Sequence, residues 1–440
     1  MKFSKYIHKQ FALLLLVCFI SIVGKAQSIL TVEQAVDLAL KNNFDIQLAK
    51  NEMQQTANNN SLGNAGMLPT LTLNASGSTA NNATKQEFSN GLVVDKSGVK
   101  SQNINTGAYL SWTVFDGLKM FATHQRLKEM EAMGTINMKL KIENVLVEVM
   151  NSYYAIVKQK QVISGLKASI LVSEERLKIA QKKLEIGVAA KPEVLQAKLD
   201  LSMQQTTLIK QLRLLNESKQ NLNQLMVVSL EQDFDVSDEI PLLNQYKYDE
   251  LKTNITNKNN DLLLSQKSTS IAKYSIQETR AAYLPKVNLN ANYIFSRNEN
   301  QAGFSLLNQN LGLNLGVTAS WTIFNGFVTA NNVKNAKLNL AYTTLQYESV
   351  KTQTQLTLLK AFKKHEEDLV ILELEQANIA LAKENLDIVL ERFKLGQSTS
   401  IELKIAQQSY EDAINNLADA RYNGKLSETT LLKLSGAIMK

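Results

Sequence analysis

The side chains that could do chemistry are few in this chain and do not cluster. His124 and His365 have no second histidine and no cysteine at metal-ligand spacing. The chain also has no glycine-rich phosphate loop after a strand pattern and no Cys–His or Ser–His–Asp arrangement. The sequence therefore predicts no enzyme, no cofactor and no metal site, and its function must come from its architecture.

The first residues have the pattern of a secretory signal peptide. Lysines precede an apolar run over 11–23, and small residues follow it. The run is shorter than the ~20 apolar residues of a membrane-spanning helix, so we expect residues 1–26 to leave by cleavage after Ala26. Cys18, the only cysteine, lies in this segment, and Val17 before it disfavours lipoprotein processing.

The charge and cysteine content of the remaining chain exclude two classes of protein. The formal charge is +7, from 48 basic and 41 acidic residues. Four of the lysines belong to the signal peptide, which leaves 44 − 41 = +3. That charge does not suggest a nucleic-acid-binding protein, and a chain without cysteine has no disulfide framework.

The segment 311–326 has the alternation of a β-strand. Its apolar residues recur at every second position from Leu311 to Ile323, and the positions between them are small or polar. In a soluble sheet the apolar face would be covered by protein, whereas in an outer-membrane barrel it would face lipid. The alternation by itself is compatible with both.

The same pattern occurs twice, because Trp112-Thr-Val-Phe-Asp-Gly117 is repeated as Trp321-Thr-Ile-Phe-Asn-Gly326. We therefore predict a mainly helical, duplicated fold whose unit is a helix, two strands and a long helical hairpin. The expected segments are a helix over 27–67, a β-hairpin over 68–117 with a loop at 77–105, a helical hairpin over 118–226 with its tip at 187–192, a linker over 227–248, a helix over 249–283, a β-hairpin over 284–326 with a loop at 296–310, a helical hairpin over 327–436 with its tip at 396–400, and a tail over 437–440.

The helical hairpins are predicted from a sustained seven-residue period. In the first hairpin, apolar residues lie seven apart at Ile142, Val149, Ile156, Ile163, Ile170, Leu177 and Leu184. Such a period is typical of a coiled-coil seam. A continuous helix over 118–186 would be about 100 Å long at ~1.5 Å per residue, which no compact domain requires.

Four strands with an apolar outer face cannot close a membrane barrel, since about eight is the smallest number that does so. An open sheet edge cannot face lipid either, because its backbone groups would be unsatisfied. The chain must therefore oligomerise. Two copies would give a barrel filled by its own side chains, and three would give twelve strands. The small inward residues Gly312, Gly316 and Ser320 favour a wide lumen and hence a homotrimer.

This order of elements resembles the TolC family of outer-membrane efflux proteins. The signal sequence, the tip segment Glu391-Arg-Phe-Lys-Leu-Gly396 and the later Ala420-Arg-Tyr-Asn423 add to the resemblance. It implies a homotrimeric channel-tunnel, in which a 12-stranded barrel in outer-membrane lipid continues as an α-helical barrel through the periplasm. It also implies a passive exit duct of a tripartite efflux pump or type I secretion system, with a periplasmic adaptor (membrane fusion protein) and an inner-membrane pump of the RND or ABC type as partners. The alternative is a periplasmic coiled-coil scaffold or adaptor, which would have one helical hairpin between β-rich halves.

The resemblance also implies positions for the pore constriction. Two acidic residues three apart follow the second tip in the family, and here these positions hold Glu402 and Ile405. We expect a ring of Glu402 carboxylates that attracts cations, partly weakened by the apolar Ile405. The alternative is that Glu402 only begins a helix, where an acid favours the dipole. For Glu193, the same position in the first repeat, this alternative is preferred.

Two further sets of residues are expected to act at surfaces. Trp112 and Trp321 are predicted aromatic residues of the membrane interface, with core packing as the alternative. The helix tips are predicted to dock on the adaptor, although a glycine after a helix is also ordinary capping chemistry. The candidate docking residues are Gly187, Val188, Arg392, Gly396, Gln397 and Ser398.

Overall fold

The computed structural model describes residues 29–241, 245–302 and 305–438. The signal peptide predicted over 1–26, with Cys18, lies outside the described residues, as do the last two residues of the tail. The elements are β1 (Ile29–Leu30), α2 (Val32–Asn42), α3 (Phe44–Asn59), β2 (Thr70–Glu87), β3 (Val93–Phe115), α4 (Lys119–Glu185), α5 (Lys191–Met226), β4 (Asp235–Val236), α6 (Tyr248–Lys258), α7 (Asn260–Arg280), the 3-10 turn η1 (Ala281–Tyr283), β5 (Lys286–Asn300), β6 (Leu307–Ser320), α8 (Val328–Lys394) and α9 (Ser400–Leu434). This order confirms the duplicated fold class.

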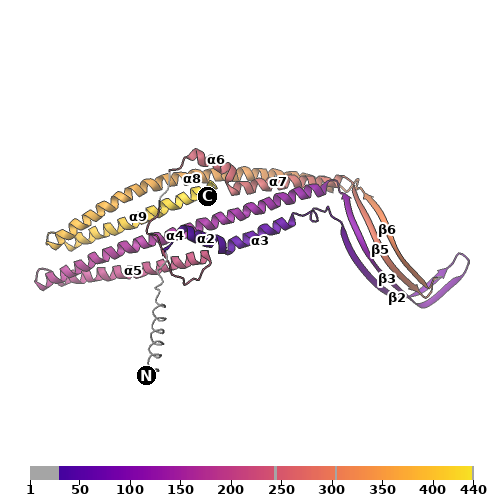
Figure 1. Cartoon of the computed structure of the whole chain (residues 1–440), viewed down its shortest axis with the longest axis horizontal. Coiled ribbons are helices and arrows are strands. Elements are labelled where there is room, and N and C mark those ends of the chain that lie inside the picture. The colour runs from indigo at the N-terminus through magenta and orange to yellow at the C-terminus, as the bar shows by residue number, and fades with distance from the viewer. Residues whose placement is uncertain (1–28, 242–244, 303–304, 439–440) are drawn as a thin grey trace, which may run out of the picture. The chain divides into compact units, whose positions relative to one another are not determined.

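The chain divides into two compact units, each built from both repeats. One comprises the described residues up to 47, 141–259 and those from 355 onward, and the other comprises 48–140 and 260–354. The first unit contains most of the two helical hairpins, with α4 beside α5 and α8 beside α9 (Figure 1). The second contains the four long strands. Helices α4 and α8 each have 67 residues and run through both units.

The four long strands form one antiparallel sheet in the order β2-β3-β5-β6. Its polar face has a ladder of hydrogen bonds between side chains. Thr113 donates to Asn288 at 2.9 Å, and Asn314 donates to Asn292 at 3.0 Å. The opposite face is apolar and open, with the Leu315 side chain 75% exposed. The strands therefore have the two faces that the alternation predicted.

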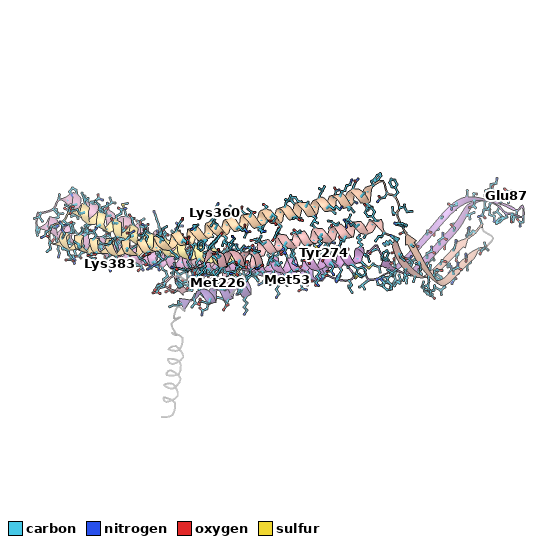
Figure 2. The ribbon with its side chains drawn as sticks, turned by 90° about the horizontal axis from the view of Figure 1, so that it is seen from above. Met53, Glu87, Met226, Tyr274, Lys360 and Lys383 are labelled. Carbon is cyan, nitrogen blue, oxygen red and sulfur yellow. The ribbon has the colours of Figure 1, made fainter. Side chains whose placement is uncertain are left out.

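The loops predicted at 77–105 and 296–310 are wrong, because both segments are mostly strand. β2 and β3 remain paired from Gly77↔Ile104 to Glu87↔Val93, with a turn only at 88–92. β5 continues to Asn300. The asparagines and serines that suggested a loop are tolerated because the backbone hydrogen bonds come from the neighbouring strand and do not depend on side-chain type. In Figure 2, Glu87 lies at the tip of the β2–β3 hairpin, away from Tyr274 of α7.

The helices predicted over 27–67 and 249–283 are each divided at a buried asparagine. Asn43 separates α2 from α3, and its amide donates to the Leu225 carbonyl at 2.9 Å. Asn259 separates α6 from α7 and donates to the Leu434 carbonyl at 3.2 Å. Both contacts join the break to the end of the returning helix of the same repeat. Asparagine favours such breaks, since its side chain competes with the helical backbone for hydrogen bonds.

The heptad residues form the core of the first unit. Val149 and Ile156 are fully buried, and Leu222, Met226 and Phe234 pack in the same cluster. Phe234 belongs to the linker predicted over 227–248, which therefore packs against the helices and pairs with the N-terminal residues through the parallel strands β1 and β4. Along the heptad positions of α4, burial decreases toward the first tip, where Leu184 is exposed.

A charge on the apolar face of β6 should prevent assembly in the membrane. We expect Leu315→Arg to cost roughly 2–4 kcal/mol if the side chain lies at the middle of the bilayer. Asn314→Arg points to the polar face and should be tolerated, because it loses only an exposed hydrogen bond. The yield of assembled protein in purified outer membranes measures the effect of both variants. Equal losses would contradict a lipid-facing apolar face and would favour a soluble sheet.

Candidate functional site

The two hairpin tips have the same backbone geometry. The long helices end at glycines in the left-handed region, Gly187 with φ 78° and Gly396 with φ 76°. The amide after each glycine bonds back to the last turn, from Val188 to the Lys183 carbonyl at 2.9 Å and from Gln397 to the Arg392 carbonyl at 2.8 Å. This is the Schellman arrangement, which requires a positive φ and therefore favours glycine.

The tips present exposed side chains and are joined to each other. Val188 is 70% exposed, whereas Ser398 is half-buried. The Arg392 guanidinium donates to the Gln397 carbonyl at 3.1 Å, which fixes the second tip. Between the hairpins, the Lys183 ammonium lies 4.3 Å from the centre of the buried Phe393 ring. A cation over an aromatic face is attractive, so this contact holds the tips together.

Glu402 is part of a capping box at the start of α9. Its Oε2 accepts hydrogen bonds from the Thr399 amide at 2.8 Å and from the Ser398 hydroxyl at 2.7 Å, while its own amide donates to Thr399 Oγ1 at 3.2 Å. The hydrogen bonds from the Thr399 amide and then from Ser398 hold the pKa of Glu402 below its ordinary value of 4.5. Glu402 therefore caps the start of α9, as the alternative considered from sequence proposed. The capping hydrogen bonds use only one of its two carboxylate oxygens, Oε2.

Ile405 lies one helical turn after Glu402 on the same face of α9, and it is 62% exposed. The first repeat differs at this point, because α5 starts at the non-capping Ala190 with Pro192 in its first turn. Glu193 therefore has no capping box around it. Of the two hairpin tips, only the second is followed by a helix with a capping box.

A layer of polar side chains joins α9 to the first hairpin. Gln407 donates to the Ser169 carbonyl at 2.9 Å and to Ser173 Oγ at 2.7 Å, and all three side chains are buried. The Glu411 carboxylate accepts hydrogen bonds from Ser169 and from Gln204 of α5. Three helices therefore share one network, one to three turns beyond Glu402.

The charged part of this layer centres on Asp200. The Arg176 guanidinium, only 1% exposed, pairs with Asp200, and Lys404 of α9 pairs with the same carboxylate at 2.9 Å. Burial alone would raise the pKa of Asp200, but the hydrogen bonds from Lys404, Arg176 and Gln196 outweigh it, so the pKa lies below the ordinary 3.8. This layer was not predicted from the sequence. Its only sequence signal is that Ser169, Ser173 and Arg176 fall at helical spacing between apolar neighbours.

A buried ion pair within α9 receives a hydrogen bond from the linker. Lys425 and Glu428 lie 2.9 Å apart with almost no exposure, and the Tyr246 hydroxyl donates to Glu428 at 3.1 Å. Burial, followed by the Glu428 charge, raises the pKa of Tyr246 to about 12, which keeps the hydroxyl protonated as a donor. These residues also lay outside the sequence prediction.

The strand-to-helix junctions of the second unit are duplicated too. Asp116 caps α4 by accepting the Met120 amide at 3.0 Å, and Asn325 accepts the Thr329 amide at 3.4 Å before α8. The tryptophans lie beside these junctions. Each donates its indole N–H to a carbonyl just before a strand, Trp112 to Met67 and Trp321 to Tyr283, both at 3.0 Å. Both rings remain exposed.

A polar cavity of about 900 Å³ lies at the base of the strands in the second unit. It includes residues of the polar strand face, such as Thr113, Lys286 and Ser320, and the ion pair of Arg126 with Glu278 at 2.9 Å. No group of three or more His, Cys, Asp or Glu side chains that could hold a metal ion occurs among the described residues.

No helix within residues 29–241, 245–302 and 305–438 is long and apolar enough to cross a membrane.

Removing the Asp200 charge should loosen α9 from the first hairpin. Breaking a fully buried pair costs about 3–5 kcal/mol, and the partial exposure of Asp200 reduces this to roughly 2–3 kcal/mol for Asp200→Asn. The control Glu217→Gln breaks an exposed pair with Arg213 and should cost less than about 0.5 kcal/mol. Denaturant midpoints followed by helical circular dichroism measure both.

The effect of Asp200 should also depend on pH in one direction. Because the folded-state pKa is lowered, the stabilisation is present above the ordinary value of 3.8 and is lost as the pH falls through the folded-state value. The difference between wild type and Asp200→Asn should therefore shrink only below about pH 4. Equal midpoints for Asp200→Asn and Glu217→Gln at neutral pH would mean that the network does not hold α9.

Comparison with known proteins agrees with this geometry. The family model described as "Outer membrane efflux protein" matches residues 35–227 and 253–437, one match for each repeat. Outer membrane protein TolC of Escherichia coli is 22% identical over 382 residues, which cover 80% of this chain and 76% of TolC. The proteases secretion protein PrtF of Dickeya chrysanthemi is 20% identical over 434 residues, covering 93% of this chain and 88% of PrtF.

Solved structures have the same fold. The CmeC outer membrane channel of Campylobacter jejuni superposes with a TM-score of 0.78 at 20% identity, covering 92% of this chain and 85% of CmeC. The MtrE outer membrane channel of Neisseria gonorrhoeae gives 0.71 at 18% identity, with coverage of 93% and 89%. These relatives are channel and secretion proteins, which argues against the periplasmic scaffold considered from sequence. The chain belongs to the outer membrane efflux protein family and is an outer-membrane exit channel of the TolC type.

Proposed function

We propose that this protein is the passive exit duct of a tripartite efflux pump or type I secretion system and works as a homotrimer. The observation that carries the proposal is the open sheet, with an exposed apolar face and two unpaired edge strands, β2 and β6. Three copies supply twelve strands, which close a barrel and leave a lumen lined by the polar ladder. Gly312 and Gly316 are small residues on this polar face, with no atom of the described residues within 4 Å of an added Cβ.

The proposed duct has an aromatic rim and a cation-attracting constriction. Trp112 and Trp321 lie at the strand ends, where amphipathic rings favour the membrane–water boundary. Glu402 and Ile405 form the constriction, with one Glu402 oxygen fixed by the capping box and the other without a hydrogen-bond partner among the described residues. Carboxylates gathered around a threefold axis attract cations, as charged rings do in channels generally.

The proposed partners are a periplasmic adaptor and an inner-membrane pump of the RND or ABC type. Support comes from the tips, where Gly187, Val188, Gly396 and Gln397 are exposed and rigidly capped. Arg392 contributes by holding the Gln397 carbonyl, and Ser398 by holding Glu402. Pre-organised loops lose little conformational entropy on binding, which suits a docking surface.

The constriction is tested by removing its charge without removing its cap. In Glu402→Gln the side chain can still complete the capping box, since glutamine also serves at this position. We expect block of the pore by divalent cations in planar-bilayer recordings to weaken on the order of tenfold. Glu193→Gln in the first repeat is the matched control and should leave the block unchanged. Unchanged block in Glu402→Gln would contradict a ring of Glu402 carboxylates.

The docking surface is tested by a charge at the first tip. Val188→Asp should reduce site-specific cross-linking to the adaptor at least about fivefold, because it places a solvated carboxylate in the contact. Lys210→Asp, an exposed change farther along the same hairpin, should leave cross-linking unchanged. Similar losses in both variants, or none in Val188→Asp, would show that the adaptor binds elsewhere.

A further inference from the structure

An apolar groove lies at the base of the strands, between the start of α4 and the end of α7. Its volume is about 370 Å³, within the range of small-molecule sites. Leu118, Phe121 and Leu284 provide its apolar lining, and Gln125, Gln277 and Arg280 provide its polar groups. All of these residues belong to the second unit.

The shape of the groove is fixed by the backbone. A Cβ on Gly117 would lie 2.4 Å from the Ala281 carbonyl oxygen, so only glycine lets α4 start this close to the η1 turn. The next residue, Leu118, also has a left-handed backbone with φ 66°, which costs a non-glycine residue roughly 1–2 kcal/mol. Leu118 therefore combines a strained backbone with an apolar side chain that is not covered, since the residue is 56% exposed.

The apolar lining lacks a cover. Phe121 is as exposed as Leu118, and Leu284 is half-exposed. Burying apolar surface is worth about 25 cal/mol per Å², and exposed apolar patches commonly mark binding surfaces. The groove is therefore suited to a ligand with an apolar portion.

The rim carries the guanidinium of Arg280. This group has no hydrogen bond and no ion pair within the described residues, whereas the nearby Glu278 is already paired with Arg126. Arg280 also has no counterpart in the first repeat, where the equivalent position is Asn64. A guanidinium binds a phosphate through two parallel hydrogen bonds, which makes an anionic phosphate a matching partner.

We propose that this groove binds one anionic glycerophospholipid of the inner leaflet of the outer membrane. An acyl chain covers Leu118, Phe121 and Leu284, and the phosphate lies against Arg280. The amides of Gln125 and Gln277 can both donate and accept hydrogen bonds, as headgroup and ester oxygens require. The position supports a lipid, because the groove begins where the apolar strand face ends and the periplasmic helices start. The proposal rests on the outer-membrane location and does not depend on the constriction or the docking tips.

The charge contribution is tested by native mass spectrometry of the full-length protein in non-ionic detergent. We expect phosphatidylglycerol to bind about five- to tenfold more tightly than phosphatidylcholine with the same acyl chains. Arg280→Gln should abolish this preference. Lys273→Gln, which removes an exposed cation from the same helix, should retain it. No preference in the wild type, or equal loss in the two variants, would overturn the proposal.

The occupant is tested by photo-crosslinking in intact outer membranes. Phe121→benzoylphenylalanine replaces one aromatic residue of the groove with a reactive one. Irradiation should increase the mass of the chain by that of one phospholipid, and Arg280→Gln should reduce the yield of this adduct. An adduct between two chains would mean that a second copy fills the groove. That result, or the absence of any adduct, would overturn the proposal.

Discussion

The rest of the molecule depends on how the four-stranded sheet satisfies its edges. β2 and β6 are the edge strands of the described sheet, so each has a row of backbone donors and acceptors without a neighbouring strand. If the sheet lies in lipid, no water is available to pair with these groups. Only closure with further strands removes both problems. The sheet thus needs further strands, and in the proposed homotrimer the polar ladder of Asn288, Asn292 and Asn314 lines the lumen.

The duplication explains which local devices are structural and which are candidates for function. Some devices present in both repeats stabilise the common scaffold, among them the asparagine breaks at Asn43 and Asn259. The proposed constriction and lipid groove lie where the copies differ. Glu402 has a capping box that Glu193 lacks, and Arg280 replaces the neutral Asn64. In the proposed homotrimer the duplicated helices would pack with approximate sixfold symmetry, whereas side chains found in only one repeat would occur three times around the axis.

Periodicity predicted most of the fold, since alternation in 311–323 and the heptads of Val149 and Ile156 report directly on which faces are buried. Strand length was underestimated because the asparagine-rich segments 77–105 and 296–310 have no apolar alternation and are held by backbone pairing. Polar contacts between distant helices, such as Arg176 with Asp200, leave almost no trace in the sequence. They depend on which helices become neighbours, and neither propensity nor period specifies that.

The measurement that tests this account most directly is the mass of the particle extracted from the membrane. The open sheet predicts a complex of three chains that remains in the outer-membrane fraction after high-salt washing and is released only by detergent. Size-exclusion chromatography with multi-angle light scattering, corrected for bound detergent, determines the number of chains. A monomer released by salt without detergent would contradict the account, because its four strands would then be stable with open edges.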